Sequence, residues 1–274
     1  MSEGKVSVSS AIKGMFSFFT ILPINIGEKN IESMNRKFWI VPIVGLFYAI
    51  LATVVFVLTF KYLAPAVAAA LTIAIVGITN RFLHFDGLID FGDGLVVAGK
   101  REDHVRALKD TLVGAGGVAT GIVVTLLLFA EYLSLDAVGF MFLGFSAELM
   151  ARNAQVAAAA FGEPGNGMAG DSVRYTNKAS LLKSSVLSIV LIAVSVFAMR
   201  YIAVEGFGWT VSNLYIYAPI VAFVVSIVWG WLISAVAKKN FGIVNGDVLG
   251  AVNETSRVVT LFAMILFVSL AGMV

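Results

Sequence analysis

Seven stretches of about 20 mostly apolar residues recur along this chain of 274 residues, and they constrain its fold more than any other feature. The hydrocarbon core of a bilayer is about 30 Å thick, and a helix crosses it in about 20 residues. Only 13% of the residues are charged, against about a quarter in a typical soluble domain. The pattern predicts an all-α, polytopic membrane helix bundle, built as one domain over residues 1–274. The predicted transmembrane helices are 38–60, 64–82, 117–134, 137–158, 183–204, 213–236 and 257–273.

The distribution of Lys and Arg predicts how these helices are oriented. If the N-terminus is cytoplasmic, 17 of the 19 basic residues fall on the cytoplasmic side, and only Lys61 and Arg200 fall outside. Cytoplasmic loops of membrane proteins carry such an excess. The long loops and most polar residues lie on the same side. We therefore expect a multi-pass protein of the cell membrane, surrounded by membrane lipid, with its active site facing the cytoplasm.

Composition and motifs exclude several classes of protein. The chain has no cysteine, so it can form neither disulfides nor thiolate metal sites. A net charge of +2, with no basic run, indicates no nucleic-acid partner. The N-terminal segment is interrupted by Lys13 and lacks a small-residue cleavage site, so we expect an interfacial helix or a lead-in to the first span rather than a signal peptide. The oligomeric state is left open, a homo-oligomer included.

The segment HFDGLIDFGDG, residues 84–94, gathers three aspartates within an otherwise apolar chain. On a helix, Asp86, Asp90 and Asp93 share one face, because positions i, i+4 and i+7 lie within about 60° of one another. Three carboxylates so close repel each other unless a cation binds them. Oxygen ligands without Cys favour a hard cation such as Mg²⁺ or Mn²⁺. The alternative is a solvated acidic turn at a helix end, which the neighbouring glycines make less attractive.

A second acidic segment, NGDVLGAVNE at residues 245–254, places Asp247 and Glu254 on one helical face. It predicts either a second half of the acidic site or an ordinary helix N-cap. His84 adjoins the aspartates but lies roughly opposite them on a continuous helix. It is a candidate general base only if the helix begins near Asp86.

Two glycine-rich segments are predicted on the cytoplasmic side. In KDTLVGAGG, residues 109–117, Lys109, Asp110 and free backbone N–H groups could hold an anion, or the segment is simply a flexible loop. The segment 161–174 contains four glycines and ends at Arg174, which suits a loop that covers a substrate. Arg152 and Asn153 end the fourth span, where interfacial anchors are common.

The order of these motifs resembles the cobalamin synthase family, adenosylcobinamide-GDP ribazoletransferase. That family has an H-x-D-G-L-x-D-x-x-D-G run, a downstream D-S-R-x-G segment and a C-terminal G-D-x-L-G-A-x-x-E run. They stand here as HFDGLIDFGDG, KDTLVGAGG and GDVLGAVNE, and the opening FSFFTILPI also matches, so the resemblance covers almost the whole chain. Two family arginines are missing, since Ile21 and Leu112 stand in their places; Arg81, Lys109, Arg152 or Arg174 would have to substitute.

The resemblance implies a Mg²⁺-dependent transferase of cobalamin biosynthesis. It would join adenosylcobinamide-GDP to α-ribazole, or to α-ribazole 5′-phosphate, and release GMP, a phosphoryl transfer governed by positioning and charge neutralisation. On this hypothesis Mg²⁺ binds the acidic residues, Lys109 and Arg152 contact phosphates, and Asp93 or Asp247 accepts the hydroxyl proton. The predicted metal ligands are Asp86, Asp90, Asp93, Asp247 and Glu254.

Two other functions are weighed against this one. A CDP-alcohol phosphotransferase also uses several aspartates on membrane helices, but its D-x-x-D-G-x-x-A-R signature is absent here. A cation-coupled transporter would also carry intramembrane carboxylates. Here, however, the acids cluster at the cytoplasmic ends of spans, and no repeat of broken helices is evident.

Overall fold

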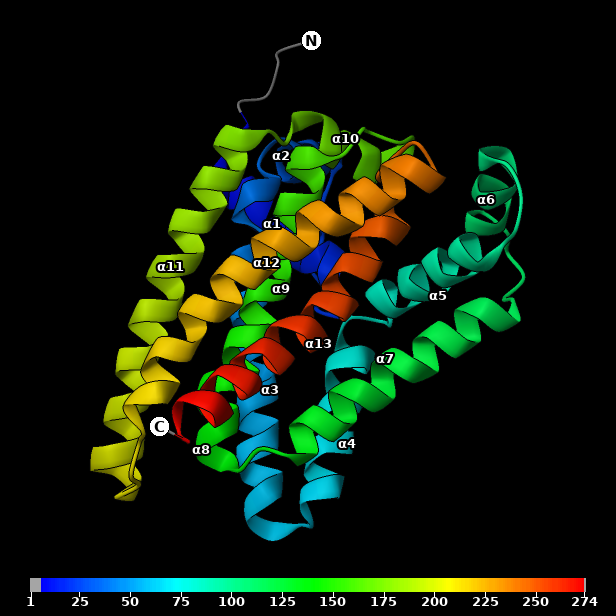
Figure 1. The fold of residues 1–274 in the computed structure, drawn as a ribbon. Helices are drawn as coiled ribbons and strands as arrows, with labels where there is room; N and C mark the ends of the chain where they lie inside the picture. Colours follow the sequence, from blue (N-terminus) through cyan, green and yellow to red (C-terminus); the bar gives the residue numbers. More distant parts are fainter. Residues whose placement is uncertain (1–5, 274) are drawn as a thin grey trace.

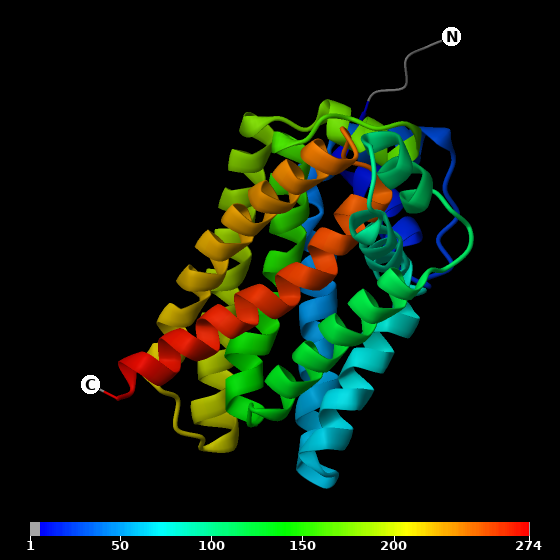
Figure 2. The ribbon, with the colours of Figure 1, turned by 45° about the vertical axis from the view of Figure 1, so that its right-hand side comes forward.

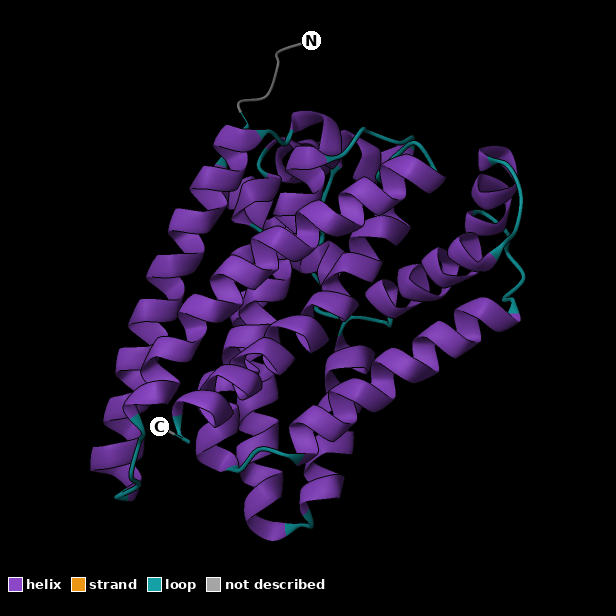
Figure 3. Ribbon diagram, in the orientation of Figure 1, coloured by secondary structure: helices purple, strands orange, loops and turns teal. Residues whose placement is uncertain are grey.

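The computed structural model describes residues 6–273, and within that range the chain is helical with no β-strand (Figure 3). The all-α prediction is therefore confirmed. Long tilted helices form one bundle, and the short helices Val8–Phe19, Glu28–Arg36, Arg101–Leu108 and Gly167–Tyr175 gather at one end of it (Figures 1 and 2). The elements in chain order are α1 (Val8–Phe19), α2 (Glu28–Arg36), η1 (Phe38–Ile40), α3 (Pro42–Tyr62), α4 (Pro65–Thr79), α5 (Leu83–Val96), α6 (Arg101–Leu108), α7 (Ala115–Leu133), α8 (Ala137–Gly139), η2 (Phe140–Gly144), α9 (Phe145–Phe161), α10 (Gly167–Tyr175), α11 (Lys178–Tyr201), η3 (Ile202–Gly206), α12 (Asn213–Asn240) and α13 (Gly246–Ala271).

Five helices of the described chain are long and apolar enough to cross a membrane, which confirms a multi-span membrane protein. They are Phe38–Tyr62, Ala115–Leu133, Lys178–Gly206, Asn213–Asn240 and Gly246–Ala271. A sixth span results if α4 and α5, which are bent by 94° at the break between them, count as one. By length and apolar composition, the described chain thus has five or six candidate spans, fewer than the seven predicted.

Two of the predicted spans are not long or apolar enough to count as single membrane-spanning helices, and the reasons differ. The 64–82 stretch ends as a helix at Thr79, and its 15 residues rise only about 22 Å, less than a hydrocarbon core. The 137–158 stretch forms α8, the π-helical η2 and α9, and it carries Glu148 and Arg152 in the bundle interior. It acts as the central helix, since α3, α11, α12 and α13 all pack on α9.

Small residues allow this close packing on α9. A Cβ added to Gly230 of α12 would lie 2.4 Å from the carbonyl oxygen of Ala154. A Cβ added to Gly45 of α3 would lie 2.9 Å from the carbonyl oxygen of Leu149. Any larger side chain at either position would separate the helices, which is why small residues are typical of membrane helix interfaces.

The break between α4 and α5 holds two consecutive residues in the left-handed backbone region. Arg81 has φ 58° and Phe82 has φ 54°, a conformation that costs about 1–3 kcal/mol per non-glycine residue. Two contacts hold it: Arg81 donates from Nη2 to the carbonyl oxygen of Thr20 (3.0 Å), and the Phe82 ring packs on Gly77. The break turns α5 away from α4 and alongside α7 (Figure 1).

The short helices α1, α2 and α10 surround the start of α13 at one end of the bundle (Figures 1 and 2). α1 is a separate helix packed on α2, so it does not run into the first span. The α9–α10 connection is tied to the α12–α13 turn, because Gly165 donates its N–H to the Val244 carbonyl (3.1 Å) and Val244 donates to that of Glu163 (2.7 Å). These contacts build one compact cap over the buried ends of α5, α9 and α13.

Candidate active site

The two acidic segments meet where α5 crosses the start of α13. A Cβ added to Gly87 would lie 2.8 Å from the Cα of Asp247, and a Cβ added to Gly250 would lie 2.9 Å from the carbonyl oxygen of His84. The two glycines therefore face each other and let the backbones touch. This contact brings Asp86 of α5 and Asp247 of α13 to the same pocket, although the two residues are far apart in sequence.

The pocket is a partly open cavity of about 110 Å³ between α1, α2, η1, α5, α9, α10 and α13. Its walls are mainly apolar, and its polar groups are few. The lining residues are Phe18, Phe19, Met34, Phe38, Leu83, His84, Asp86, Gln155, Met168, Ala169, Ser172, Gly246, Asp247 and Leu249. Met168, Ala169 and Ser172 of the 161–174 segment thus line the pocket as part of α10, and the substrate-covering role of this segment stays a prediction.

Asp90 and Asp93 continue the acidic face of α5 away from the pocket. Asp90 is half-buried and within Coulomb range of Asp247 and Asp86. Asp93 has a different role, because its Oδ2 accepts the N–H of Gly114 and its Oδ1 accepts the N–H of Gly117, each at 2.7 Å. Both oxygens thus cap the N-terminus of α7, where a negative charge is favourable. This geometry makes Asp93 an anchor for α7 and leaves Asp247 the better placed of the two predicted proton acceptors.

The carboxylates fit Mg²⁺ by their chemistry. Within residues 6–273, no three His, Asp or Glu side chains converge closely enough to hold a metal by themselves. Mg²⁺ does not require three, because it typically takes one or two carboxylates and completes its shell with water and substrate phosphates. Asp86 and Asp247 share one pocket with Asp90 nearby, and they supply the hard oxygen donors that such an ion prefers.

His84, with Arg152 behind it, forms the polar floor of the pocket. Arg152 donates from Nη1 to His84 Nε2 (2.7 Å) and to Gln155 Oε1 (3.1 Å). The His84 ring stacks on Phe19 with centroids 5.6 Å apart, and the Arg152 guanidinium lies over the same Phe19 ring at 5.2 Å. The helix begins at Leu83, before Asp86, so the condition under which His84 could be the general base is not met. Its accepting nitrogen is moreover occupied by a cationic donor.

The structure separates the other predicted binding residues from the pocket. Asn153 is fully buried; it accepts from Ser184 and donates to Ser226, and so joins α9 to α11 and α12. Arg174 is exposed and pairs with Asp171 at 2.6 Å. Lys109 and Asp110 lie in the exposed α6–α7 connection, where Asp110 accepts the N–H of Leu112, the position at which the family has arginine. Of these four, only Lys109 lies within Coulomb range of Asp247.

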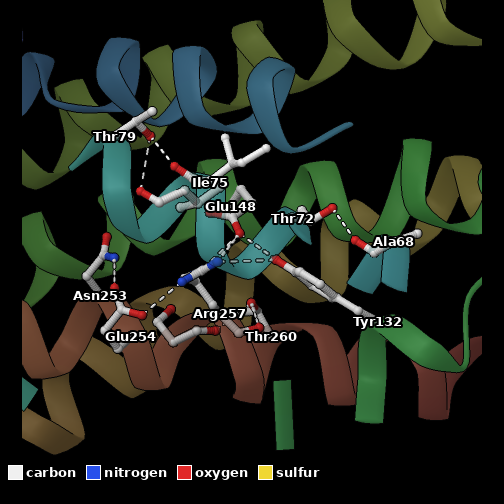
Figure 4. Close-up of polar contacts among 12 residues, drawn as sticks. Ala68, Thr72, Ile75, Thr79, Tyr132, Glu148, Asn253, Glu254, Arg257 and Thr260 are labelled. Atoms are coloured by element: carbon white, nitrogen blue, oxygen red, sulfur yellow. Dashed lines mark hydrogen bonds and ion pairs between the residues drawn. The ribbon is translucent and has the colours of Figure 1, made fainter. Parts of the chain in front are cut away.

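Glu254 belongs to a buried ion-pair network instead of the acidic pocket (Figure 4). Arg257 donates from Nη1 to Glu254 Oε2 (2.8 Å) and from Nε to Glu148 Oε1 (2.8 Å). Tyr132 donates to the same Glu148 oxygen at 2.5 Å, and Asn253 donates to Glu254 Oε1 at 3.0 Å. Glu254 also lines a second cavity, beside Asn80, Phe82 and Phe85. Its predicted metal-binding role stays a prediction, with no support from this arrangement.

No role for Glu148, Arg257 or Tyr132 was predicted from the sequence. The sequence does contain a sign of the network, because an ionisable residue inside an apolar stretch indicates a polar bundle interior. Glu148 and Arg152 are one helical turn apart on α9, and Arg257 lies one turn after Glu254 on α13. Two buried arginines and two buried glutamates thus balance their charges at the bundle centre.

The fold and the pocket together define a polytopic helical membrane protein with a pocket that is largely apolar and carries two carboxylates. The family model for cobalamin-5-phosphate synthase matches residues 11–265. The chain is 31% identical to the adenosylcobinamide-GDP ribazoletransferase of Methanocella arvoryzae, over 93% of this chain and 95% of that relative. It is also 31% identical to that of Methanosarcina barkeri (96% and 94%) and 30% identical to that of Thermococcus onnurineus (92% and 96%). No solved structure matches the chain.

The chain therefore belongs to the cobalamin-5-phosphate synthase family. Membership makes it a transferase of cobalamin synthesis and confirms the resemblance drawn from its motifs.

Proposed function

We propose that this protein joins adenosylcobinamide-GDP to α-ribazole, or to its 5′-phosphate, and releases GMP. The observation that carries the proposal is the crossing of α5 and α13, which places Asp86 and Asp247 in one pocket. These residues belong to the two motifs that relate the chain to its family. The relatives named for this activity match over more than nine-tenths of the chain.

In the proposed reaction a ribose hydroxyl of α-ribazole attacks the phosphorus next to the cobinamide arm. The new O–P bond forms as the bond from that phosphorus to the bridging diphosphate oxygen breaks, and GMP leaves with this oxygen. Asp247 accepts the hydroxyl proton. Its Oδ2 is held by the Asn245 amide at 2.6 Å, which fixes the carboxylate for this role.

Asp86, Asp90 and Asp247 would hold Mg²⁺. The ion, when bound, would neutralise the diphosphate and the charge that develops on the leaving group. Asp93 fixes the start of α7 through Gly114 and Gly117, and Lys109 supplies positive charge on the same side of the site. Arg152 positions the His84 ring at the pocket floor instead of contacting phosphate.

The test is GMP release by the purified protein in lipid nanodiscs, with adenosylcobinamide-GDP, α-ribazole and Mg²⁺. Asp86→Asn and Asp247→Asn should each lower turnover by about 10²–10⁴-fold, the usual contribution of a charge-stabilising or proton-accepting group. The matched control is Asp171→Asn, which removes a carboxylate that pairs with Arg174 at the exposed face of α10. CMP release from CDP-alcohols, or cation flux in vesicles, without GMP release would refute the proposal.

We also propose that the pocket opens to the cytoplasm at the cell membrane. The end of the bundle that carries α1, α2, α6 and α10 holds most of the exposed basic residues, as the positive-inside rule requires of a cytoplasmic face. Because the chain lacks cysteine, single cysteines report the topology directly. Ala179→Cys, at the start of α11, should react with a membrane-impermeant maleimide only from the cytoplasmic side. Labelling from the outside would reverse the proposed orientation.

A further inference from the structure

An apolar groove runs between α11 and α12. Both helices pack along α9 but have little contact with each other, and their connection lies at the end of the bundle away from α10 (Figure 1). The groove has a volume of about 450 Å³, against about 110 Å³ for the acidic pocket. Every residue that lines it is apolar; Ile192 and Val196 are buried at its floor, and Phe197 and Ile220 are exposed. Because α11 and α12 are both candidate membrane spans, the groove faces hydrocarbon and not water.

A cation stands at one end of this groove. Arg200 lies one helical turn beyond Val196 on the same face of α11, and its Nη1 donates to Oδ1 of Asn213 on α12 at 3.4 Å. This contact is long for a hydrogen bond, and Arg200 forms no ion pair with another residue of the range 6–273. The exposed side chains of Tyr201 and Tyr217 lie within about one turn of these two residues, and such aromatic residues are typical of the membrane–water boundary. The guanidinium is therefore available to an anion at the level of the lipid headgroups.

The length of the groove matches one leaflet of a bilayer. From Ile189 to Arg200, α11 rises about 16 Å, because each residue of a helix adds 1.5 Å. From Asn213 to Phe223, α12 rises about 15 Å. Half of a hydrocarbon core is also about 15 Å thick. A hydrocarbon chain that starts at the level of Arg200 therefore reaches the inner end of the groove, at Ile189 and Phe223.

We propose that the groove holds one hydrocarbon chain of a bound phospholipid, whose phosphate pairs with Arg200. The walls offer no hydrogen-bond partner, so the buried part of the ligand must be apolar throughout. At the boundary the guanidinium supplies a positive charge and a fork of donors that suits a phosphate. The amide N–H₂ group of Asn213, whose oxygen faces Arg200, adds a further donor beside it.

A helix from a second copy of the chain does not suit the same groove. A helix about 10 Å across and about 16 Å long occupies about 1,300 Å³, almost three times the volume of the groove. Helix contacts inside this bundle use glycine, as Gly45 and Gly230 show where α3 and α12 meet α9. The groove is lined mainly by Ile, Val and Phe instead. Its volume and its walls thus favour a single hydrocarbon chain.

The first test locates the lipid on the unaltered protein. Phosphatidylcholine nanodiscs carry a small fraction of phosphatidylglycerol with a photoreactive diazirine at the end of one acyl chain, and peptide mass spectrometry maps the cross-links. They should be at least about fivefold enriched near Ile189 and Phe223, relative to the similarly exposed residues 122–127 of α7. Equal labelling of the two faces would overturn the proposal. Labelling concentrated at Phe197 and Ile216 would also overturn it, since the chain would then enter from the opposite leaflet.

The second test separates the contribution of Arg200 from that of the groove. Native mass spectrometry of protein released from phosphatidylglycerol nanodiscs counts the phospholipid that each variant retains. Arg200→Gln should weaken retention about fivefold, the loss expected for one cation near lipid phosphates. Ala193→Trp, which fills the groove, should abolish retention.

Each variant has a matched control. Lys61→Gln removes the other basic residue predicted on the same side of the membrane, and Leu126→Trp adds the same bulk on the exposed face of α7. Both controls should retain phospholipid like the wild type. Equal retention by Arg200→Gln and Lys61→Gln would overturn the phosphate contact. A lipid-free dimer that Ala193→Trp converts to a monomer would show that a second copy fills the groove and would overturn the proposal.

Discussion

Substitution of Gly87 by alanine tests whether the contact of α5 with α13 builds the active site. The added Cβ would lie 2.8 Å from the Cα of Asp247 and 2.9 Å from its carbonyl oxygen, whereas non-bonded carbons prefer about 3.5–4.0 Å. The two helices must therefore move apart by about 1 Å. Overpacking of this kind typically costs about 1–3 kcal/mol, and a misplacement of about 1 Å between reacting groups can lower the rate about 10²-fold.

The matched control is Gly206→Ala in η3, where the nearest atom to a new Cβ is 3.9 Å away. Alanine is favoured over glycine in a helix by up to about 1 kcal/mol, so this variant should be unchanged or slightly more stable. Thermal unfolding in nanodiscs and GMP release measure both effects. If Gly87→Ala matches Gly206→Ala in Tm and in turnover, the close contact does not position Asp247, and the reasoning fails.

Two further predictions concern residues that the sequence left without a structural role. Arg257→Met leaves Glu148 and Glu254 buried without a counter-charge, so it should cost about 3–5 kcal/mol of stability; Arg257→Lys should restore little, because one ammonium cannot replace the three donor nitrogens of the guanidinium. A wild-type Tm for Arg257→Met would contradict the network. Asp93→Asn removes the charge that caps α7, and amide hydrogen exchange at Gly114 and Gly117 should accelerate. A loss of turnover with unchanged exchange would instead restore Asp93 as the proton acceptor.

Helical periodicity predicted that Asp86, Asp90 and Asp93 share one face of α5, but of these three only Asp86 lines the pocket. Asp86 and Asp247 were both selected from the spacing of acids and glycines, and the structure places them in one pocket. Periodicity does not show how far along the helix axis a side chain lies from the pocket. Glu254 follows Asp247 by two turns on the same face, which carries it about 10 Å further along α13, and there it meets Arg257 rather than the pocket.

The sequence also could not predict contacts between residues that are far apart in the chain. The turn at Arg81 and Phe82 depends on the Thr20 carbonyl and on the space beside Gly77, neither of which leaves a local signal. The same applies to Asp93, whose partners lie on another helix. The local sequence pattern therefore predicted the apolar helices and the acidic motifs. The break between α4 and α5, and the partner of each charged side chain, could be found only from the three-dimensional structure.

The tie between the α9–α10 connection and the α12–α13 turn has a mechanical consequence. Val244 exchanges backbone hydrogen bonds with Glu163 and Gly165, just before α10, and it stands three residues before Asp247. The Lys238–Glu163 pair, at 2.8 Å, adds a second link at the end of α12. A displacement of α10 would therefore pull on the segment that carries Asp247. If Asp247 accepts the proton, as proposed, the position of α10 and the alignment of that carboxylate are coupled through one short stretch of backbone.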